Sequence, residues 1–405
     1  MTLPQPNQTL SFEPTAPLPQ GYRCAGYAGG IKADNSLDMA LFVSDEPASC
    51  AGTFTRNKLC AAPVKIGRER VPGADLRAIV MNSGNANACT GPQGEADALT
   101  MGAETAAILG VAPEQVLMCS TGGIGKFLPM PTLSAALPGL VDALSPSAGE
   151  TAARAMMTTD TRPKHFSTTV TLGGVPCRFT GFAKGAGMIE PNMATMLAYL
   201  FTDAQVAPAD LQAALSNAVN HSFNRISIDG DQSTNDTVYL MANGAAGGPA
   251  LSPDHPDWNL FVEAIQGLCH HLALAIVKDG EGMTRFITLH IEGAKDNAEA
   301  DRAARAIANS FLVKTGWAGV YPAWSRILDV LGYCDVELNT DAIGIDYDDL
   351  PVVRNTLATD TPAEEVLKVS TADEYTVRVD LGVADGNAVL YTCDCTEEYV
   401  RINLV

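Results

Sequence analysis

One threonine in the sequence lies where a flexible loop gives way to a long apolar run. Gly185 and Gly187 let the backbone of this loop adopt conformations closed to other residues, and Pro191 restricts the turn that follows. Residues 193–201 are almost entirely apolar and are expected to enter the core as a buried strand. Thr195 places a hydroxyl at the start of that strand, so its side chain is a candidate nucleophile.

Thr195 is also a candidate for cutting its own chain. The bond between Ala194 and Thr195 joins a small residue to a β-branched one at the boundary of loop and strand, where backbone strain can concentrate. Attack of the hydroxyl on the Ala194 carbonyl would form an ester, and water would then release Thr195 as a new N-terminus. Its α-amine, with a pKa of roughly 7.7 to 8.0, could act as the general base. The alternative is an ordinary strand threonine that bonds a neighbouring backbone group.

A second candidate site is the glycine-rich loop that follows an apolar strand expected at 115–119. The loop reads Ser120-Thr-Gly-Gly-Ile-Gly-Lys126, which invites comparison with a phosphate-binding loop. That pattern requires Ser or Thr after the lysine, but residue 127 is Phe, so phosphate binding is excluded. Backbone amides of such a loop can instead stabilise the oxyanion of an acyl transfer. A simple tight turn is the alternative.

The sequence predicts neither a metal nor a bound cofactor. The acidic run 229–236 resembles a calcium loop, but Thr234 and Leu240 stand where an EF-hand requires Gly and Glu. We expect this run either to brace the nucleophile or to form a surface turn. The six histidines show no ligand spacing, so a zinc site is not expected.

Several segments, in order along the chain, resemble those of one enzyme family. Residues 184–197, Lys-Gly-Ala-Gly-Met-Ile-Glu-Pro-Asn-Met-Ala-Thr-Met-Leu, resemble the self-processing motif of the ornithine acetyltransferases, also called glutamate N-acetyltransferases. Further similar segments are Asn82–Gly91, Ser120–Gly122, Met157–Thr161, Phe223–Asp231, Ser233–Thr237, Lys278–Gly282, Ala306–Ser310, Leu312–Thr315 and Tyr399–Asn403. The resemblance extends from about residue 17 to the end of the chain.

This resemblance implies a role for each matching residue. Cleavage between Ala194 and Thr195 would free Thr195 as the nucleophile, which also contacts the substrate, and Thr121 and Gly122 would stabilise the oxyanion. Four further residues are implied to bind the substrate, with the glutamate taking its ammonium group: Thr161, Lys184, Glu281 and Asn403. On their own, the lysine and the glutamate would be interpreted as surface residues, because burial of an unpaired charge is costly.

The implied activity is transfer of the acetyl group of N-acetylornithine to glutamate, through an acyl-Thr195 intermediate, in arginine biosynthesis. Acetyl-CoA is a second candidate donor, and the cleaved chains are implied to remain together as an α2β2 assembly. Two alternatives stay open. One is an N-terminal-nucleophile amidase or peptidase that uses water as acceptor, and the other is an uncleaved binding or regulatory protein.

Composition excludes several classes of protein. Lys and Arg number 26 against 46 Asp and Glu, so the net charge of -20 disfavours nucleic acid and anionic membranes but attracts a cationic substrate. The ten cysteines are scattered and lack the pattern of a secreted disulfide scaffold. Residues 1–20 do not have the pattern of a signal peptide, and no window reaches about 18 consecutive apolar residues. We therefore expect a soluble, cytoplasmic protein without a membrane span.

Apolar periodicity predicts the elements that must position these residues. Strands are expected at 76–81, 115–119, 287–291 and 375–381, and helices at 94–109, 208–220, 258–276, 296–311 and 324–331. A chain of 405 residues exceeds the size of a single core. The predicted fold is α/β, and the resemblance implies a layered αββα-type sandwich with a smaller α+β C-terminal domain. We expect a catalytic domain at 1–290, which contains the cleavage site, and a domain at 291–405 that closes the active site.

Overall fold

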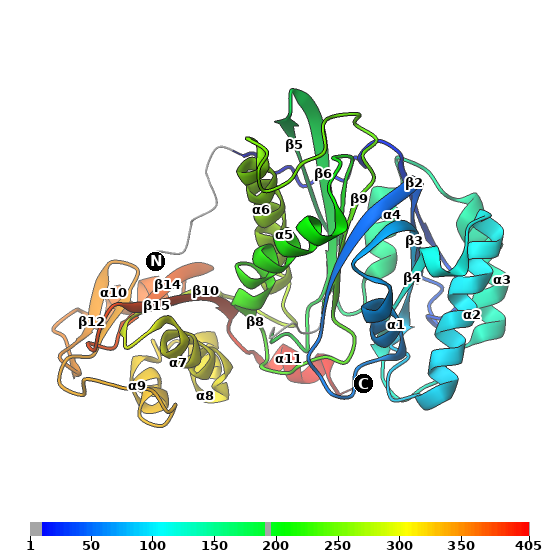
Figure 1. Ribbon diagram of the computed structural model, residues 1–405. Helices are drawn as coiled ribbons and strands as arrows, with labels where there is room; N and C mark the ends of the chain where they lie inside the picture. The colour runs from blue at the N-terminus through cyan, green and yellow to red at the C-terminus, as the bar shows by residue number, and fades with distance from the viewer. Residues whose placement is uncertain (1–9, 191–195, 405) are drawn as a thin grey trace.

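Two mixed β-sheets form the framework of the chain in a computed structural model that describes residues 10–190 and 196–404 (Figure 1). The first sheet contains, in spatial order, β4 (Val116–Gly123), β3 (Gly73–Asn85), β2 (Met39–Phe54), β9 (Thr237–Ala242), β7 (Leu197–Thr202), β6 (Val175–Lys184) and β5 (Lys164–Leu172), with β1 (Tyr22–Tyr27) beside β2. The expected mixed α/β class is confirmed.

Strand β2 bends the first sheet into two halves that face each other. The first part of β2 pairs with β3 and the second with β9, and the β2–β3 register shifts between Val43 and Ala48. Aromatic rings of the two halves meet in the space between them. Phe42 of β2 stacks on Phe201 of β7 with ring centroids 5.2 Å apart, and its centroid is 5.1 Å from that of Phe182 on β6. The two halves therefore share a buried core.

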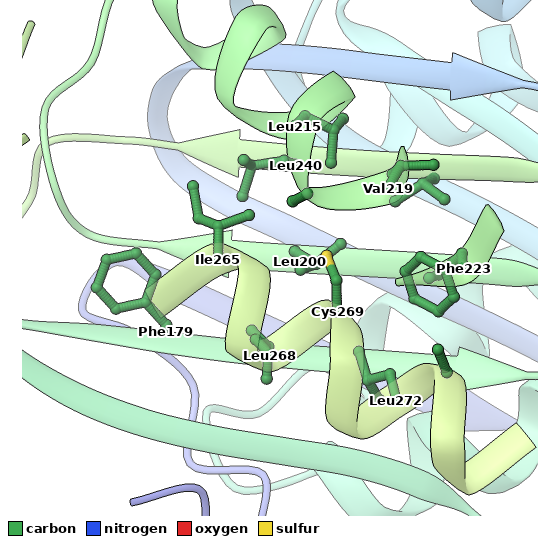
Figure 2. Packing of buried hydrophobic residues seen from close by; sticks show 14 of the residues in the cluster. Phe179, Leu200, Leu215, Val219, Phe223, Leu240, Ile265, Leu268, Cys269 and Leu272 are labelled. Atoms are coloured by element: carbon green, nitrogen blue, oxygen red, sulfur yellow. The ribbon is translucent and has the colours of Figure 1, made fainter. Parts of the chain in front are cut away.

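Helices cover the outer face of each half. On one side α2 (Gly91–Leu109) and α3 (Met130–Asp142) pack against β1 to β4, and α1 (Ala62–Arg70) lies beside them. On the other side α5 (Pro208–Asn220) and α6 (Trp258–Val277) pack against β2, β5 and β6. Helix α4 (Gly149–Met156) instead contacts strands of both halves and buries Ala152 and Met156 in their shared core. Figure 2 shows Leu215 of α5 and Leu268 of α6 packed with Leu200 and Leu240 of the sheet.

Helix α6 is long and apolar enough to cross a membrane, and it is the one helix of the described residues that passes this test. More than half of its apolar stretch is buried inside the protein. It contacts β5, β6 and α5, and Phe261, Ile265 and Leu272 on its inner side are fully buried. Its composition is therefore accounted for by its place in the core.

The second sheet contains, in spatial order, β13 (Leu357–Ala358), β12 (Leu350–Arg354), β11 (Gly344–Tyr347), β14 (Glu374–Asp380), β10 (Phe286–Ala294), β15 (Gly386–Cys393) and β8 (Ile226–Ser227). The helices of this part of the chain are α7 (Asn297–Asn309), α8 (Phe311–Ala318), α9 (Trp324–Leu331), α10 (Ala363–Ser370) and α11 (Glu397–Ile402). Two short 3₁₀ turns lie earlier in the chain, Pro113–Gln115 before β4 and Phe223–Arg225 before β8. Strand β8 belongs to the middle of the chain, so its parallel pairing with β15 ties the second sheet to the first part. Residue 290 lies inside β10, and we propose the domain boundary just before this strand.

Candidate active site

A cavity of about 340 Å³ lies where the ends of β4 and β6 meet the turn after α6 and the C-terminal helix α11. Its lining residues are Ala86, Thr121, Gly122, Gly123, Ile124, Thr158, Thr159, Lys184, Gly187, Met188, Ser233, Thr234, Asn235, Glu281 and Asn403. Five of the predicted site residues are among them: Thr121, Gly122, Lys184, Glu281 and Asn403. The fold thus brings together side chains that are up to 282 positions apart in the sequence.

The glycine-rich loop at the end of β4 contributes Thr121 and Gly122. β3 and β4 run parallel here, with Gly84 opposite Gly122. Gly122 has φ +129°, and a Cβ atom at this position would lie 2.4 Å from the Gly84 carbonyl carbon, so only glycine fits. Thr121 is buried, and its hydroxyl has no hydrogen-bond partner among the described residues. The Thr121 hydroxyl is therefore available to a ligand in the cavity, and Gly122 lies beside it in the cavity wall.

Asn235 joins this loop to the opposite wall. Its Nδ2 donates to the backbone oxygens of Ala86 at 2.6 Å and Ser120 at 2.8 Å, while Thr234 Oγ1 donates to its Oδ1 at 2.6 Å. The residues from Ser233 to Thr237 are buried. For these residues the surface-turn interpretation is wrong, and the acidic run braces the cavity instead. Within the described residues, no group of acidic, histidine or cysteine side chains has the arrangement of a metal site.

Lys184, the last residue of β6, places a buried ammonium at the cavity wall. Its Nζ donates to Thr158 Oγ1 at 2.7 Å and lies 3.9 Å from Asp160 Oδ2. Burial lowers the pKa of Lys184, and the nearby Asp160 carboxylate opposes this effect only in part. Burial alone would raise the pKa of Asp160, but Lys184, Lys164 and the Gly185 amide outweigh it and hold this pKa well below its usual range.

Thr161 is not among the described residues that line the cavity. Its backbone nitrogen donates to Asp279 Oδ2 at 3.1 Å, and its hydroxyl donates to Asp279 Oδ1. Asp279 in turn binds Lys164, which also binds Asp160. Thr161 therefore belongs to a buried charge network behind the cavity. Two other threonines of the same segment, Thr158 and Thr159, line the cavity and were not assigned from the sequence.

Replacement of Lys164 by Met is expected to destabilise the protein strongly. Lys164 Nζ lies 2.6 Å from Asp160 and 2.5 Å from Asp279, and all three side chains are at most 2% exposed. Its loss leaves two buried carboxylates without their main partner, which should lower the free energy of unfolding by about 3–5 kcal/mol. Urea denaturation measures this change. Lys295→Met, at an exposed pair with Glu337, is the control, and an equal effect of the two variants would contradict the prediction.

Glu281 and Asn403 form a further part of the cavity wall. The Glu281 backbone nitrogen donates to Ala186 O at 2.8 Å, and Asn403 Nδ2 donates to Glu281 Oε2 at 2.7 Å. A Cβ atom on Gly187 would lie 2.5 Å from the Glu281 carboxyl carbon, so this glycine allows the carboxyl to lie against the chain. Glu281 is 9% exposed, which leaves a carboxylate that faces the cavity with one oxygen held in place.

The predicted nucleophile Thr195 and its neighbour Ala194 lie outside the described residues, but both flanks of their segment are held by aspartates of the acidic run. Met188 and Ile189 donate their backbone N–H groups to Asp229 at 2.5 and 2.8 Å. On the other flank, the Met196 N–H donates to Asp236 Oδ1 at 2.9 Å. Because Met188 lines the cavity, the flank before the predicted cleavage site is part of its wall.

Comparison with known proteins identifies the family. The model of the ArgJ family matches residues 23–404. The chain belongs to the ArgJ family. Curated relatives named "Arginine biosynthesis bifunctional protein ArgJ" are similar over nearly their whole length. The one from Geobacter sulfurreducens is 44% identical, with 95% of this chain and 98% of the relative covered. The one from Geobacillus stearothermophilus is 39% identical, with 98% of this chain and 96% of the relative covered. The predicted resemblance is thus confirmed.

Two solved structures of the family are also similar. The crystal structure of the arginine biosynthesis bifunctional protein from Bacillus halodurans is 40% identical and has a TM-score of 0.48, covering 50% of this chain and 95% of that chain. The structure of ornithine acetyltransferase from Mycobacterium tuberculosis complexed with ornithine is 38% identical with a TM-score of 0.41, covering 45% of this chain and 98% of that chain.

Proposed function

We propose that this protein transfers the acetyl group of N-acetylornithine to glutamate, with Thr195 as the acyl carrier. Family membership, with relatives named as bifunctional proteins of arginine biosynthesis, confirms the predicted class, an acyltransferase of that pathway. The observation that carries the proposal is the convergence of five predicted site residues on one cavity. Met188, on the flank before the predicted cleavage site, lines the same cavity, and Met196, on the other flank, is bound by Asp236. Thr195 itself enters the proposal from the sequence.

The proposed reaction has two halves. After cleavage between Ala194 and Thr195, the free α-amine of Thr195 takes the proton of its hydroxyl, which attacks the acetyl carbonyl carbon of N-acetylornithine. The Thr121 hydroxyl and the Gly122 N–H stabilise the oxyanion. When the intermediate collapses, the Thr195 ammonium gives its proton to the amide nitrogen, the bond between this nitrogen and the acetyl carbon breaks, and ornithine leaves as the free amine. The glutamate amine then attacks the acyl-Thr195 ester. This is a ping-pong cycle, and water must be kept from the ester.

The charges of the cavity fit such substrates. We propose that Glu281, held by Asn403, binds the side-chain ammonium of the ornithine moiety, and that Lys184 attracts a substrate carboxylate. Thr161 would act through Asp279 and the charge network, because its hydroxyl is bound there. The substrates are small molecules, which suits a cavity of about 340 Å³.

Several finer expectations belong to the same proposal. We propose that the layer order of helix, sheet, sheet, helix is the αββα-type scaffold that holds the cavity, and that the two cleaved chains assemble as α2β2. Acetyl-CoA as a second donor is consistent with the word bifunctional in the names of the relatives. A cytoplasmic location follows from the proposed biosynthetic role.

Product analysis separates the proposed transferase from an amidase. The protein is incubated with N-acetylornithine, with and without glutamate. A transferase makes N-acetylglutamate only when glutamate is present, whereas a hydrolase releases acetate in both cases. Acetate release at the same rate with and without glutamate, and no N-acetylglutamate, would replace the proposed function by hydrolysis.

Glu281→Gln is expected to weaken the binding of N-acetylornithine. The substitution keeps a group that Asn403 can bond but removes the negative charge, and a hydrogen bond to a charged group is worth about 1.5–3 kcal/mol. The expected result is a fall in kcat/KM of about 10- to 100-fold, mainly through KM, in steady-state kinetics. Glu397→Gln, on the exposed face of α11, is the control and should leave KM unchanged. An unchanged KM in the Glu281 variant would remove Glu281 from the substrate site.

A further inference from the structure

Two basic loops lie at the edge of the candidate active site, and the proposed transfer from N-acetylornithine uses neither. The first basic loop, residues 55–60, connects β2 to α1 and carries Arg56 and Lys58. The second basic loop, residues 124–127, follows β4 and carries Lys126. All three residues are exposed, and in the described part of the chain none of their side chains has an ion-pair or hydrogen-bond partner. These three cations are therefore free to bind a ligand.

Both loops border the cavity. Ile124 lines the cavity and is 43% exposed, so the cavity opens to solvent at the second basic loop. The first basic loop is bonded to another part of the wall. Thr55 Oγ1 donates to Ser233 O at 2.7 Å, and directly after the loop the Ala61 N–H donates to Thr234 O at 2.8 Å. Ser233 and Thr234 both line the cavity, so each loop is fixed to the cavity wall.

The two loops are neighbours because both are bound to residues 86–88. The Gly125 N–H of the second loop donates to Ala88 O at 3.0 Å. The Ala62 N–H, just after the first loop, donates to Asn87 O at 3.4 Å. A small buried apolar cluster joins the same segments. The three cations therefore lie around one short segment at the edge of the cavity.

Acidic side chains are missing from the sequence around both loops. The chain has 46 Asp and Glu among 405 residues, yet none of them stands within residues 47–68 or within residues 115–141. Asn57 of the first loop donates to Gln232 O at 3.3 Å, and Asp231 precedes that glutamine, but neither cation of the loop forms an ion pair with it. This edge can therefore attract an anion although the net charge of the whole molecule is -20.

Each basic loop also exposes a large apolar side chain next to its lysine. Leu59 follows Lys58 and is 69% exposed, and Phe127 follows Lys126 and is 63% exposed. The backbone of Phe127 is held in place, because its oxygen accepts a hydrogen bond from Asn85 Nδ2 at 2.9 Å. Cationic side chains bind phosphate groups, and an exposed aromatic ring can stack on a nucleobase. Together the loops present the groups that a phosphorylated nucleotide requires.

Resting on the proposed function, in which acetyl-CoA is a second acetyl donor, we propose that the two basic loops bind the phosphorylated nucleotide of acetyl-CoA. A long flexible arm separates the phosphate groups of this coenzyme from its thioester. The acetyl end enters the cavity, which at about 340 Å³ is too small for the whole coenzyme, and the nucleotide lies outside it on the loops. N-acetylornithine has no phosphate group, so the loops serve only one of the two donors.

The test compares the two donors with glutamate as the common acceptor. In the triple variant Arg56→Gln, Lys58→Gln and Lys126→Gln, we expect kcat/KM for acetyl-CoA to fall roughly 10- to 100-fold, because each exposed ion pair changes binding about 2- to 5-fold. The value of kcat/KM for N-acetylornithine should change less than about 2-fold, because this donor does not touch the loops. Steady-state formation of N-acetylglutamate measures both.

A matched triple variant controls for the change in net charge. Lys295→Gln, Arg302→Gln and Lys368→Gln also removes one arginine and two lysines from exposed positions, but from the part of the chain that builds the second sheet. It should leave kcat/KM for both donors unchanged. If the test variant does not fold, Lys126→Gln alone decides, with an expected fall of about 2- to 5-fold for acetyl-CoA only.

Acetyl-pantetheine, which has the thioester and the arm but no nucleotide, locates the effect on the coenzyme. The wild-type protein should prefer acetyl-CoA to acetyl-pantetheine, and the triple variant should lose most of this preference. A wild-type preference that persists in the triple variant would overturn the inference. So would a wild-type protein that uses N-acetylornithine but not acetyl-CoA, and in both cases the proposed transfer from N-acetylornithine stands. A wild-type protein that uses neither donor would contradict the proposed function itself.

Discussion

Thr195→Ala is expected to give one uncut chain without measurable acetyl transfer. The variant lacks the hydroxyl that would attack Ala194, so neither the new N-terminus nor the acyl carrier can form. Removal of a nucleophile that acts as part of a catalytic unit costs orders of magnitude, and we expect kcat to fall at least about 10⁴-fold. Denaturing electrophoresis measures the cleavage, and N-acetylglutamate formation measures the transfer.

Two control variants make this result specific to the hydroxyl at position 195. Thr195→Ser keeps a hydroxyl and should retain slow cleavage and transfer. Thr202→Ala makes the same chemical change at the far end of β7, where the Thr202 hydroxyl accepts the Ala204 N–H, and should be cleaved and active. Transfer by the uncut Thr195→Ala chain at the normal rate would contradict the assignment.

Thr121→Val is expected to lower kcat for acetyl transfer by about 10²–10³-fold, the effect of removing one donor from an oxyanion site. Valine keeps the β-branched shape of the buried threonine, so the loop should keep its conformation and KM should change little. Only the hydroxyl that faces the cavity is lost. Steady-state kinetics on the cleaved fraction, with its amount determined by electrophoresis, measure the effect.

Thr100→Val on α2 is the control for the oxyanion prediction. The Thr100 hydroxyl is exposed and donates to Ala96 O of its own helix, so its loss should not affect kcat. A Thr121 variant with a normal kcat would show that the oxyanion is stabilised elsewhere. A raised KM with a normal kcat would instead place Thr121 in substrate binding.

Local periodicity predicted those elements whose boundaries have clear signals. The helix expected at 208–220 is α5, Pro208–Asn220, because a proline at its first turn marks the start and leucines recur on one face. The helix expected at 296–311 ends earlier, at Asn309. Ser310 has an extended backbone there, and its hydroxyl caps a new helix, α8, through the Val313 N–H.

Strand β2 shows what local patterns could not predict. Its middle reads Asp45-Glu-Pro47, which is exposed and typical of a turn, yet the strand continues on both sides because one half pairs with β3 and the other with β9. Such a bend depends on partners far away in the sequence. Its consequence, the facing of the two sheet halves, was therefore expected only from the family resemblance.

The candidate site also contains residues that could be assigned from the sequence and residues that could not. Roles for Thr121, Gly122 and Lys184 could be assigned only because they stand within short segments that resemble the family. On its own, Lys184 would have been interpreted as a surface residue. The bracing role of Asn235 could not be assigned, since it depends on bonds to Ala86 and Ser120, which are 149 and 115 positions away. The sequence also could not predict that Thr161 lies away from the cavity, because the residue that binds its hydroxyl, Asp279, is 118 positions away.

Intact-mass analysis of the purified, active protein, combined with N-terminal sequencing, tests the central claim most directly. We predict two chains that correspond to residues 1–194 and 195–405, the second beginning with Thr195. We also predict that N-acetylornithine without glutamate adds one acetyl group to the second chain. A fully active protein that consists of one uncut chain, or a new N-terminus at a residue other than Thr195, would contradict the account.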